Sequence, residues 1–210
     1  HGLIRSPAAF QILARLTGRD RHLRAGSHNV TPGAWAWTVL SELESLGASL
    51  CEVELPAFDA GDLLLVLDVE AAAAFDELTR TGEVARLTEQ GPGSWPNLFR
   101  SARLVPAVEY LQAQRLRTQL MLAMEQTMRT IDMLVHPPYA AGVLTLTNLT
   151  GHPTFVAPAG FDDRGRPYSV CLTGQLFDEE RLLALASAWQ RATRHHERHP
   201  LLAPAPGAAR

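Results

Sequence analysis

The sequence predicts an α/β domain built around a mixed sheet. A helical pattern up to residue 47 is followed directly by a strand-like run at 48–56, at the spacing of an α/β unit. Short apolar runs bounded by proline and glycine begin at residue 132 and indicate buried strands, which a final helix follows. The chain of 210 residues is 46% hydrophobic and 20% charged, so it is long and apolar enough to bury such a core.

The first segment of the chain is expected to be a short helix followed by a loop. Residues 7–17 place Phe10, Leu13 and Leu16 three apart, which is the spacing of one helix face. Gly18 should end this helix, because the stretch after it is polar and rich in turn-forming residues.

The next two elements are a helix and a strand. Thr31 and Pro32 form an N-cap followed by a proline in the first turn, so we expect a helix from there to Gly47. Within residues 48–56, Leu50, Val53 and Leu55 form a strand-like apolar pattern, which predicts a strand.

The middle of the chain is expected to be helical. Residues 59–80 are rich in helix-forming residues, with Asp59 as a cap and Gly82 as the stop. Residues 91–97 predict a turn, and a long helix should cover 106–131. Its predicted apolar face comprises Val108, Leu111, Leu120, Met124, Met128 and Ile131.

The last third of the chain predicts three strands of one sheet and a closing helix. Apolar runs occupy 133–136, 154–158 and 168–173, and the short segment around Gly165 should join the last two as an antiparallel hairpin. A helix over 178–194 should follow. Its predicted buried side consists of Leu182, Leu185, Ala186 and Trp189.

Composition excludes several classes of function. The net charge of −3 provides no broad positive field, so neither nucleic acid nor an anionic membrane is an expected partner. The longest apolar stretch is interrupted by Asp68 and Glu70, so no membrane span is predicted. Cys51 and Cys171 form neither a zinc-binding pattern nor a disulfide framework, which favours a cytoplasmic location. All 19 basic residues other than histidine are arginines, so no lysine can act as a base or form a Schiff base.

A histidine cluster near the C-terminus allows two interpretations. His195, His196 and His199 have helical spacings at which two imidazoles can share a metal ion. A solvated helix end, where histidine interacts favourably with the helix dipole, explains the same residues and is the interpretation we adopt. No metal site and no cofactor are therefore predicted.

Residues 132–174 carry the most specific pattern in the chain. A strand that ends in proline is followed by an Asn-x-x-Gly-x-Pro step and a Gly-x-Pro hairpin before a Gly-x-x-Phe-x-Glu helix start. This order closely resembles the C-terminal region of the amidase-signature family, and LESLGASLCEVELP and VPAVEYLQAQRLR resemble two further segments of it. The matching positions are Asp132, Leu134, Pro137, Asn148, Gly151, Pro153, Pro158, Gly160, Gly165, Pro167, Gly174, Phe177, Glu179, Leu182 and Leu183.

The resemblance implies the C-terminal part of an α/β/α layered fold and an activity in amide hydrolysis. In this family the nucleophilic Ser, a second Ser in a cis peptide and a general-base Lys lie in a Gly/Ser-rich N-terminal half. This sequence contains neither a lysine nor such a stretch, so no catalytic residue can be assigned to it. We expect a substrate-side portion that is inactive alone and that meets a small amide substrate together with the missing half. The alternative is a non-catalytic amidase-like binding or assembly module.

The expected substrate pocket lies beyond Pro137, where the strand ends, because ligands of α/β sheets gather there. The candidate lining residues are Tyr139, Thr145, Thr147 and Asn148, placed on a polar loop. Equally, Thr147 and Asn148 can satisfy backbone groups of a turn. The family's amidotransferase members tend to place an Asp in this loop, and the absence of an acidic residue from 139–147 disfavours glutamine as the substrate.

The expected organisation is one amidase-like portion over 1–200 and a disordered tail over 201–210. Within the first part, 1–32 should be a loop-rich lead-in, 33–131 mainly helical with one strand, and 132–200 the hairpin and the closing helix. A homo-oligomer is compatible with this organisation.

Overall fold

A computed structural model describes residues 10–14, 34–51, 55–56, 63–138 and 141–200. The chain forms two compact units. The first consists of residues 1–55 and 125–210 and contains the sheet, and the second consists of residues 56–124 and is helical in its described part.

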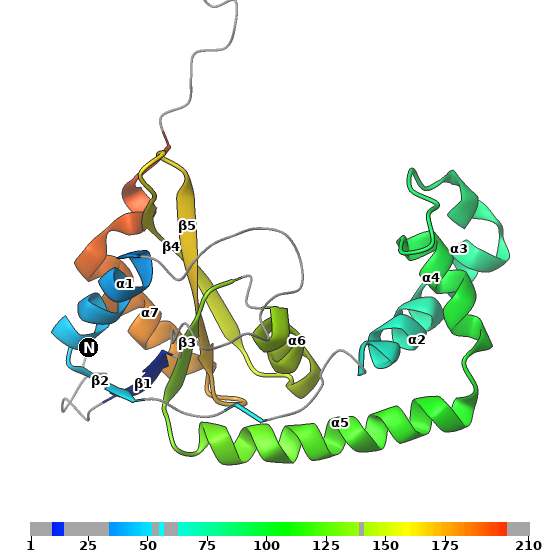
Figure 1. Ribbon diagram of the computed structural model, residues 1–210, viewed down its shortest axis with the longest axis horizontal. Coiled ribbons are helices and arrows are strands. Elements are labelled where there is room, and N and C mark those ends of the chain that lie inside the picture. Colours follow the sequence, from blue (N-terminus) through cyan, green and yellow to red (C-terminus); the bar gives the residue numbers. More distant parts are fainter. Residues whose placement is uncertain (1–9, 15–33, 52–54, 57–62, 139–140, 201–210) are drawn as a thin grey trace, which may run out of the picture. The chain divides into compact units, whose positions relative to one another are not determined.

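The first unit contains a mixed five-stranded sheet in the order β2-β1-β3-β5-β4 (Figure 1). Its strands are β1 Phe10–Ala14, β2 Ala48–Cys51, β3 Met133–His136, β4 Thr154–Phe161 and β5 Pro167–Gly174. β1 is parallel to both β2 and β3, whereas β5 is antiparallel to β3 and to β4. The predicted single sheet with an antiparallel hairpin is therefore confirmed.

The helix predicted over residues 7–17 is wrong where the structure describes that segment. Phe10–Ala14 form the strand β1, which lies between β2 and β3. Its partners begin at Ala48 on one side and Met133 on the other, far away in the sequence. A short apolar run cannot be distinguished from a helix by periodicity alone, and these distant partners decide the outcome. The loop expected after Gly18 lies outside the described residues.

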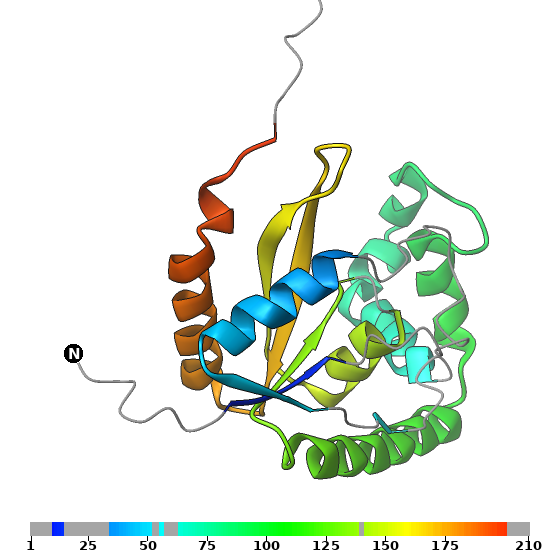
Figure 2. The ribbon, with the colours of Figure 1, turned by 60° about the vertical axis from the view of Figure 1, so that its left-hand side comes forward.

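Helices lie on both sides of this sheet. Figures 1 and 2 show α1 Ala34–Ser45 and α7 Glu179–Thr193 on one side, and α6 Ala141–Thr150 on the other. The helices expected before Gly47 and over 178–194 are confirmed, although the predicted cap at Thr31 and Pro32 lies outside the described residues. No helix in the described parts of the chain is long and apolar enough to cross a membrane.

The main core fills the space between the sheet and the helices α1 and α7. All four predicted core residues of α7 are buried, which confirms that face of the helix. The cluster comprises Val39, Leu43, Ala48, Met133, Val135, Ala157, Ala159, Val170, Leu172, Leu182, Leu185, Ala186 and Trp189. Apolar side chains from helices and strands thus meet in one cluster, and their burial is the main stabilising contribution to this unit.

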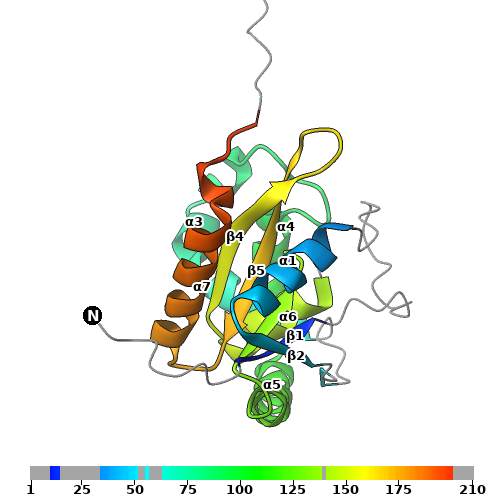
Figure 3. The ribbon, with the colours of Figure 1, turned by 90° about the vertical axis from the view of Figure 1, so that its left-hand side faces the viewer.

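The β4–β5 hairpin runs alongside α7 (Figure 3). Its turn is closed by Asp162, whose Oδ1 accepts hydrogen bonds from the backbone N–H groups of Arg164 and Arg166. The strand register shifts between Pro158 and Gly160, which marks a β-bulge in the edge strand.

The second unit contains four helices and two 3₁₀ turns in its described part. They are α2 Leu64–Ala74, α3 Asp76–Arg80, η2 Glu83–Arg86, α4 Trp95–Ser101, η3 Ala102–Leu104 and α5 Ala107–Met128, whose last residues belong to the first unit. The single helix expected over 59–80 is instead divided at Phe75, whose ring stacks on Phe99 with centroids 4.9 Å apart. Gly82, at φ 80°, follows α3 as predicted, whereas Asp59 lies outside the described residues.

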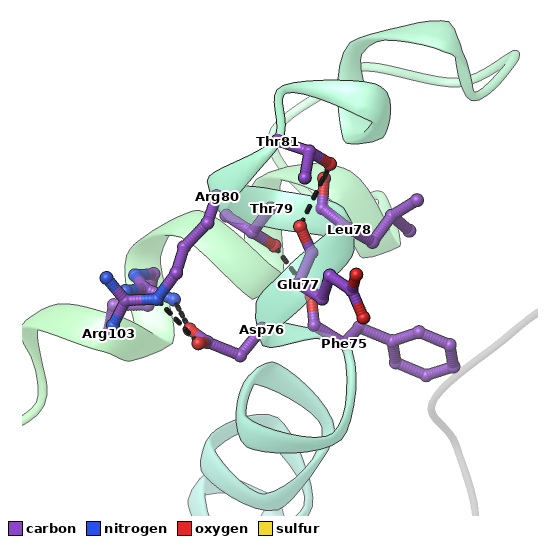
Figure 4. A network of polar contacts seen from close by, with 8 residues as sticks. All are labelled: Phe75, Asp76, Glu77, Leu78, Thr79, Arg80, Thr81 and Arg103. Atoms are coloured by element: carbon purple, nitrogen blue, oxygen red, sulfur yellow. Dashed lines mark hydrogen bonds and ion pairs between the residues drawn. The ribbon is translucent and has the colours of Figure 1, made fainter.

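Asp76 links α3 to η3 (Figure 4). Its carboxylate accepts hydrogen bonds from Arg80, at 2.6 Å, and from Arg103. The hydrogen bond from Arg80, followed by that from Arg103, lowers the pKa of Asp76 below its ordinary value. The two arginines therefore keep this exposed carboxylate charged.

Two further expectations for the second unit are wrong in part. Residues 95–97 of the predicted turn form the first turn of α4, with Ser94 as the N-cap and Pro96 in the first turn. The predicted helix over 106–131 is confirmed as α5, and its Leu120, Met124 and Met128 are buried. At its start, however, Val108 and Leu111 are 62% and 58% exposed. The apolar periodicity of α5 therefore extends to the start of the helix, where its apolar side chains are exposed.

Candidate functional site

The register of the three strands β3, β5 and β4 divides their side chains between two faces of the sheet. Met133, Val135 and Leu172 belong to the main core, so the residues between them face the other side. On that side, which also carries the apolar Leu134 and Val156, His136 lies opposite Cys171, and Thr173 lies opposite Thr154. We call these last four residues the polar face.

Three residues of the polar face form a hydrogen-bonded row across the strands. The Nε2 atom of His136 is 2.9 Å from Oγ1 of Thr173, which is 2.7 Å from Oγ1 of Thr154. The Nδ1 atom of His136 is 3.0 Å from the carbonyl oxygen of Pro137. His136 and Thr173 are only 6% and 0% exposed, so these hydrogen bonds replace those that water would provide.

A second buried pair lies where α6 ends. The Nδ1 atom of His152 is 2.8 Å from Oγ1 of Thr150, whose hydroxyl donates to the carbonyl of Leu146 at 2.8 Å. Burial lowers the pKa of His152, and burial likewise lowers the pKa of His136 although its hydrogen bond to Pro137 acts in the opposite direction. Burial therefore favours the neutral form of both rings in the folded chain.

Acidification is expected to destabilise the chain through these two histidines. The unfolded chain takes up protons near the ordinary pKa of 6.5, whereas folded His136 and His152 resist protonation to a lower pH. Their contribution to the free energy of unfolding is thus fully present above pH 6.5 and decreases as the pH falls through the lowered pKa values. Urea unfolding at a series of pH values should show this decrease, and the double variant H136Q/H152Q should flatten it. An unchanged slope in that variant would contradict the assignment.

Cys171 faces His136 in the register but does not form an activated thiolate pair with it. Burial raises the pKa of the Cys171 thiol to about 11. Both ring nitrogens of His136 have hydrogen-bonding partners other than the sulfur. The pair therefore provides no thiolate nucleophile at neutral pH.

The predicted pocket residues lie on a helix and not on a loop, which corrects the expected local structure. Thr145, Thr147 and Asn148 belong to α6, and Tyr139 lies outside the described residues. The Thr147 hydroxyl and the Asn148 amide both donate to the Leu144 carbonyl, at 3.1 and 2.9 Å. These contacts satisfy a backbone group, as the alternative interpretation expected, but inside a helical turn. Thr147 is buried and Asn148 is exposed.

Sequence reasoning missed the residues of the polar face and the Thr150–His152 pair. The available signal was a polar residue inside an apolar strand run, such as His136 within residues 133–136 and Thr173 at the end of β5. Buried polar residues of this kind must find partners, so they are more informative than exposed ones.

Two of the three clustered histidines, His195 and His196, lie near carboxylates. His195 Nε2 is 2.9 Å from Oε1 of Glu42 on α1, and His196 Nε2 is 3.9 Å from Oε1 of Glu197. Within the residues that the structure describes, no three His, Cys, Asp or Glu side chains form a group that could hold a metal ion. The contact with Glu42 connects the C-terminal 3₁₀ turn to the first helix.

Comparison of the sequence with curated proteins finds amidases and glutamyl-tRNA(Gln) amidotransferases. An amidase from Pseudomonas putida is 32% identical, in an alignment that covers 78% of this chain and 40% of the amidase. The A subunit of the glutamyl-tRNA(Gln) amidotransferase from Chloroflexus aggregans is 32% identical, in an alignment that covers 90% of this chain and 48% of that protein. The chain thus spans less than half the length of these relatives. No protein-family model matches the sequence.

Comparison of the fold with solved structures leads to the same group of proteins. A 6-aminohexanoate cyclic dimer hydrolase matches 94% of this chain and 48% of its own, with a TM-score of 0.72 at 15% identity. A bacterial aryl acylamidase described as belonging to the amidase-signature enzymes matches 90% of this chain and 44% of its own, with a TM-score of 0.68 at 17% identity. Together with the related sequences and the ordered motif residues, this shared fold shows that the chain resembles a part of the amidase-signature enzymes.

Proposed function

We propose that the chain forms the substrate-side portion of an amidase-signature amidohydrolase that cleaves a carboxylic amide C–N bond. Its similarity to less than half of each relative supports this proposal. The nucleophilic Ser, the cis-Ser and the general-base Lys would then come from protein outside these 210 residues. This division agrees with the absence of lysine from the sequence.

In this proposal the chain binds and orients the amide, and the other half performs the covalent chemistry. Thr145, Thr147 and Asn148, with Tyr139, would line part of the pocket. α6 follows the carboxyl end of β3 after a short connection, and ligands of α/β sheets collect at such ends. Backbone and side-chain hydrogen-bonding groups on rigid elements are suited to holding an amide in the geometry that attack requires.

The chain alone is expected to show no turnover of simple amides. A hydroxyl nucleophile needs a neighbouring base, and the family's base is a lysine that this chain cannot supply. Release of ammonia from benzamide and of nitroaniline from p-nitroacetanilide would be measured on the purified chain. The rates should equal those of a Trp189→Ala variant purified in the same way, because the two preparations carry the same contaminants. Turnover with a stoichiometric burst of product would contradict the proposal.

A non-catalytic binding or assembly module is the second candidate, and the edge strand β4 favours it. Pro158 cannot donate a backbone hydrogen bond, the register shift beside it disturbs the edge, and Arg198 stacks over Phe161 at 5.3 Å. A sheet edge protected in this way is typical of a finished domain. Repeating the amide assay with the N-terminal half of a related amidase added in trans separates the two candidates, because restored turnover would exclude the module.

A further inference from the structure

The hydrogen-bonded row on the polar face has a defined direction, because one of its members can only accept. The carbonyl oxygen of Pro137 has no proton to donate, so Nδ1 of His136, 3.0 Å away, carries the ring proton. The buried neutral ring has one N–H, so its Nε2 is an acceptor, and the Thr173 hydroxyl donates to it over 2.9 Å. Thr173 has then used its proton and accepts the hydroxyl proton of Thr154 over 2.7 Å.

This direction determines what Thr154 presents to solvent. Its hydroxyl proton is donated to Thr173, so the remaining lone pairs of the oxygen can only accept further hydrogen bonds. Thr154 is exposed at the first position of β4, and Val156, the next residue on the same face of that strand, is 56% exposed. A hydrogen-bond acceptor therefore lies beside an uncovered apolar side chain.

We propose that Thr154 and Val156 form a subsite for the N–H group of a carboxamide. The Thr154 oxygen accepts the amide N–H, and the isopropyl group of Val156 contacts the apolar substituent of the same ligand. The choice of a carboxamide rests on the proposed function, which supplies a ligand with N–H donors. Thr154 lies only a few residues after the end of α6 in the chain, so the subsite adjoins the segment that carries the proposed pocket residues.

The same row could serve only to fix the register of the three strands, and a ligand readout is needed to separate these roles. Both roles predict that Thr173→Val changes stability, because it removes the centre of a buried network. Only the subsite predicts discrimination between ligands that have an N–H and ligands that lack one. A site arranged to accept a hydrogen bond disfavours an analogue that has no proton to donate.

The test uses the full chain labelled with ¹⁵N and two matched probes, isobutyramide and N,N-dimethylisobutyramide. Titrations followed by amide shifts should place isobutyramide at Thr154 and Val156, and the dimethyl analogue should bind more weakly by about 5-fold, the effect of one neutral hydrogen bond. Thr154→Val should weaken isobutyramide by a similar factor and leave the dimethyl analogue unchanged. Thr154→Ser should retain the wild-type preference, and so should Ser169→Ala, the control on the neighbouring strand.

Four outcomes would overturn the subsite. Equal affinity for the two probes, or an unchanged preference in Thr154→Val, would refute the subsite. Neither result would refute the proposed function, because the amide assay tests that function separately. Absence of isobutyramide binding would likewise refute the subsite and not the proposed function. Imidazole ¹⁵N shifts of the free chain provide a test that needs no ligand: the proton of His136 is expected on Nδ1, and a proton on Nε2 would reverse the row and refute the proposal.

Discussion

Replacing Trp189 with alanine is expected to lower the free energy of unfolding by about 4 kcal/mol. The Trp189 side chain is 0% exposed and lies in the core between the sheet and α1. Its indole N–H also donates to Oε2 of Glu42 at 3.0 Å. Alanine would leave a large cavity. It would also remove the N–H group that donates to Glu42, and Glu42 is the residue that contacts His195 as well. Urea unfolding followed by far-UV circular dichroism measures the loss without depending on the missing indole.

Two further variants separate packing from hydrogen bonding at this site. Trp189→Phe keeps most of the apolar volume but removes the donor, so about 2 kcal/mol should be lost. Glu42→Gln keeps an acceptor for the indole and should cost less than either change at Trp189. A loss below about 1 kcal/mol in Trp189→Ala would mean that α7 is not held in the core as described.

Local periodicity was sufficient to predict the elements whose buried side is long or consistently apolar. The helix α1, the buried face of α7 and the hairpin around Gly165 are encoded in consecutive residues, so the sequence alone located them. β1 was not recognised because five residues contain too little periodicity, and its parallel neighbours come from distant segments. In a parallel sheet the decisive partners are never adjacent in the chain.

The helix α6 was missed for a different reason. Threonine and asparagine are weak helix formers, so the polar stretch of residues 145–148 indicated a loop. Its helix is stabilised by burial of Leu146 and Leu149 and by hydrogen bonds from Thr147 and Asn148 to a carbonyl of the preceding turn. Tertiary burial thus overrode the intrinsic preference of this segment.

The candidate site could be located only roughly from the sequence. The motif residues around Pro137 and Gly151 indicated this region of the chain as a candidate, but the pairing of Thr154 with Thr173 depends on the register of the hairpin. That register includes a shift between Pro158 and Gly160, and a shift of one residue would move the polar row to the opposite face. Gly160 is therefore a position at which backbone geometry affects both the fold and the polar face.

Replacing Gly160 with alanine is expected to lower the free energy of unfolding by about 3 kcal/mol. Gly160 has φ +140°, a conformation that side chains disfavour, and an added Cβ would lie 2.7 Å from the hydroxyl oxygen of Tyr168 and 2.9 Å from its Cζ. Tyr168 is the cross-strand partner of Gly160, so relief of the clash requires displacement of the ring or of the strand. Urea unfolding measures the loss, and amide shifts at Thr154 and Thr173 report whether the register moves with it.

Gly142→Ala is the matched control for this substitution. Gly142 lies in α6 with open space around its Cβ position and without a positive φ, so alanine there should stabilise the helix by up to about 1 kcal/mol. The two glycine-to-alanine changes are thus expected to have opposite signs. Equal effects would show that the close approach of Tyr168 does not constrain β4. In the double variant G160A/Y168A the two losses should be less than additive, because Tyr168 packs against the core and its removal has its own cost, but it also removes the clash.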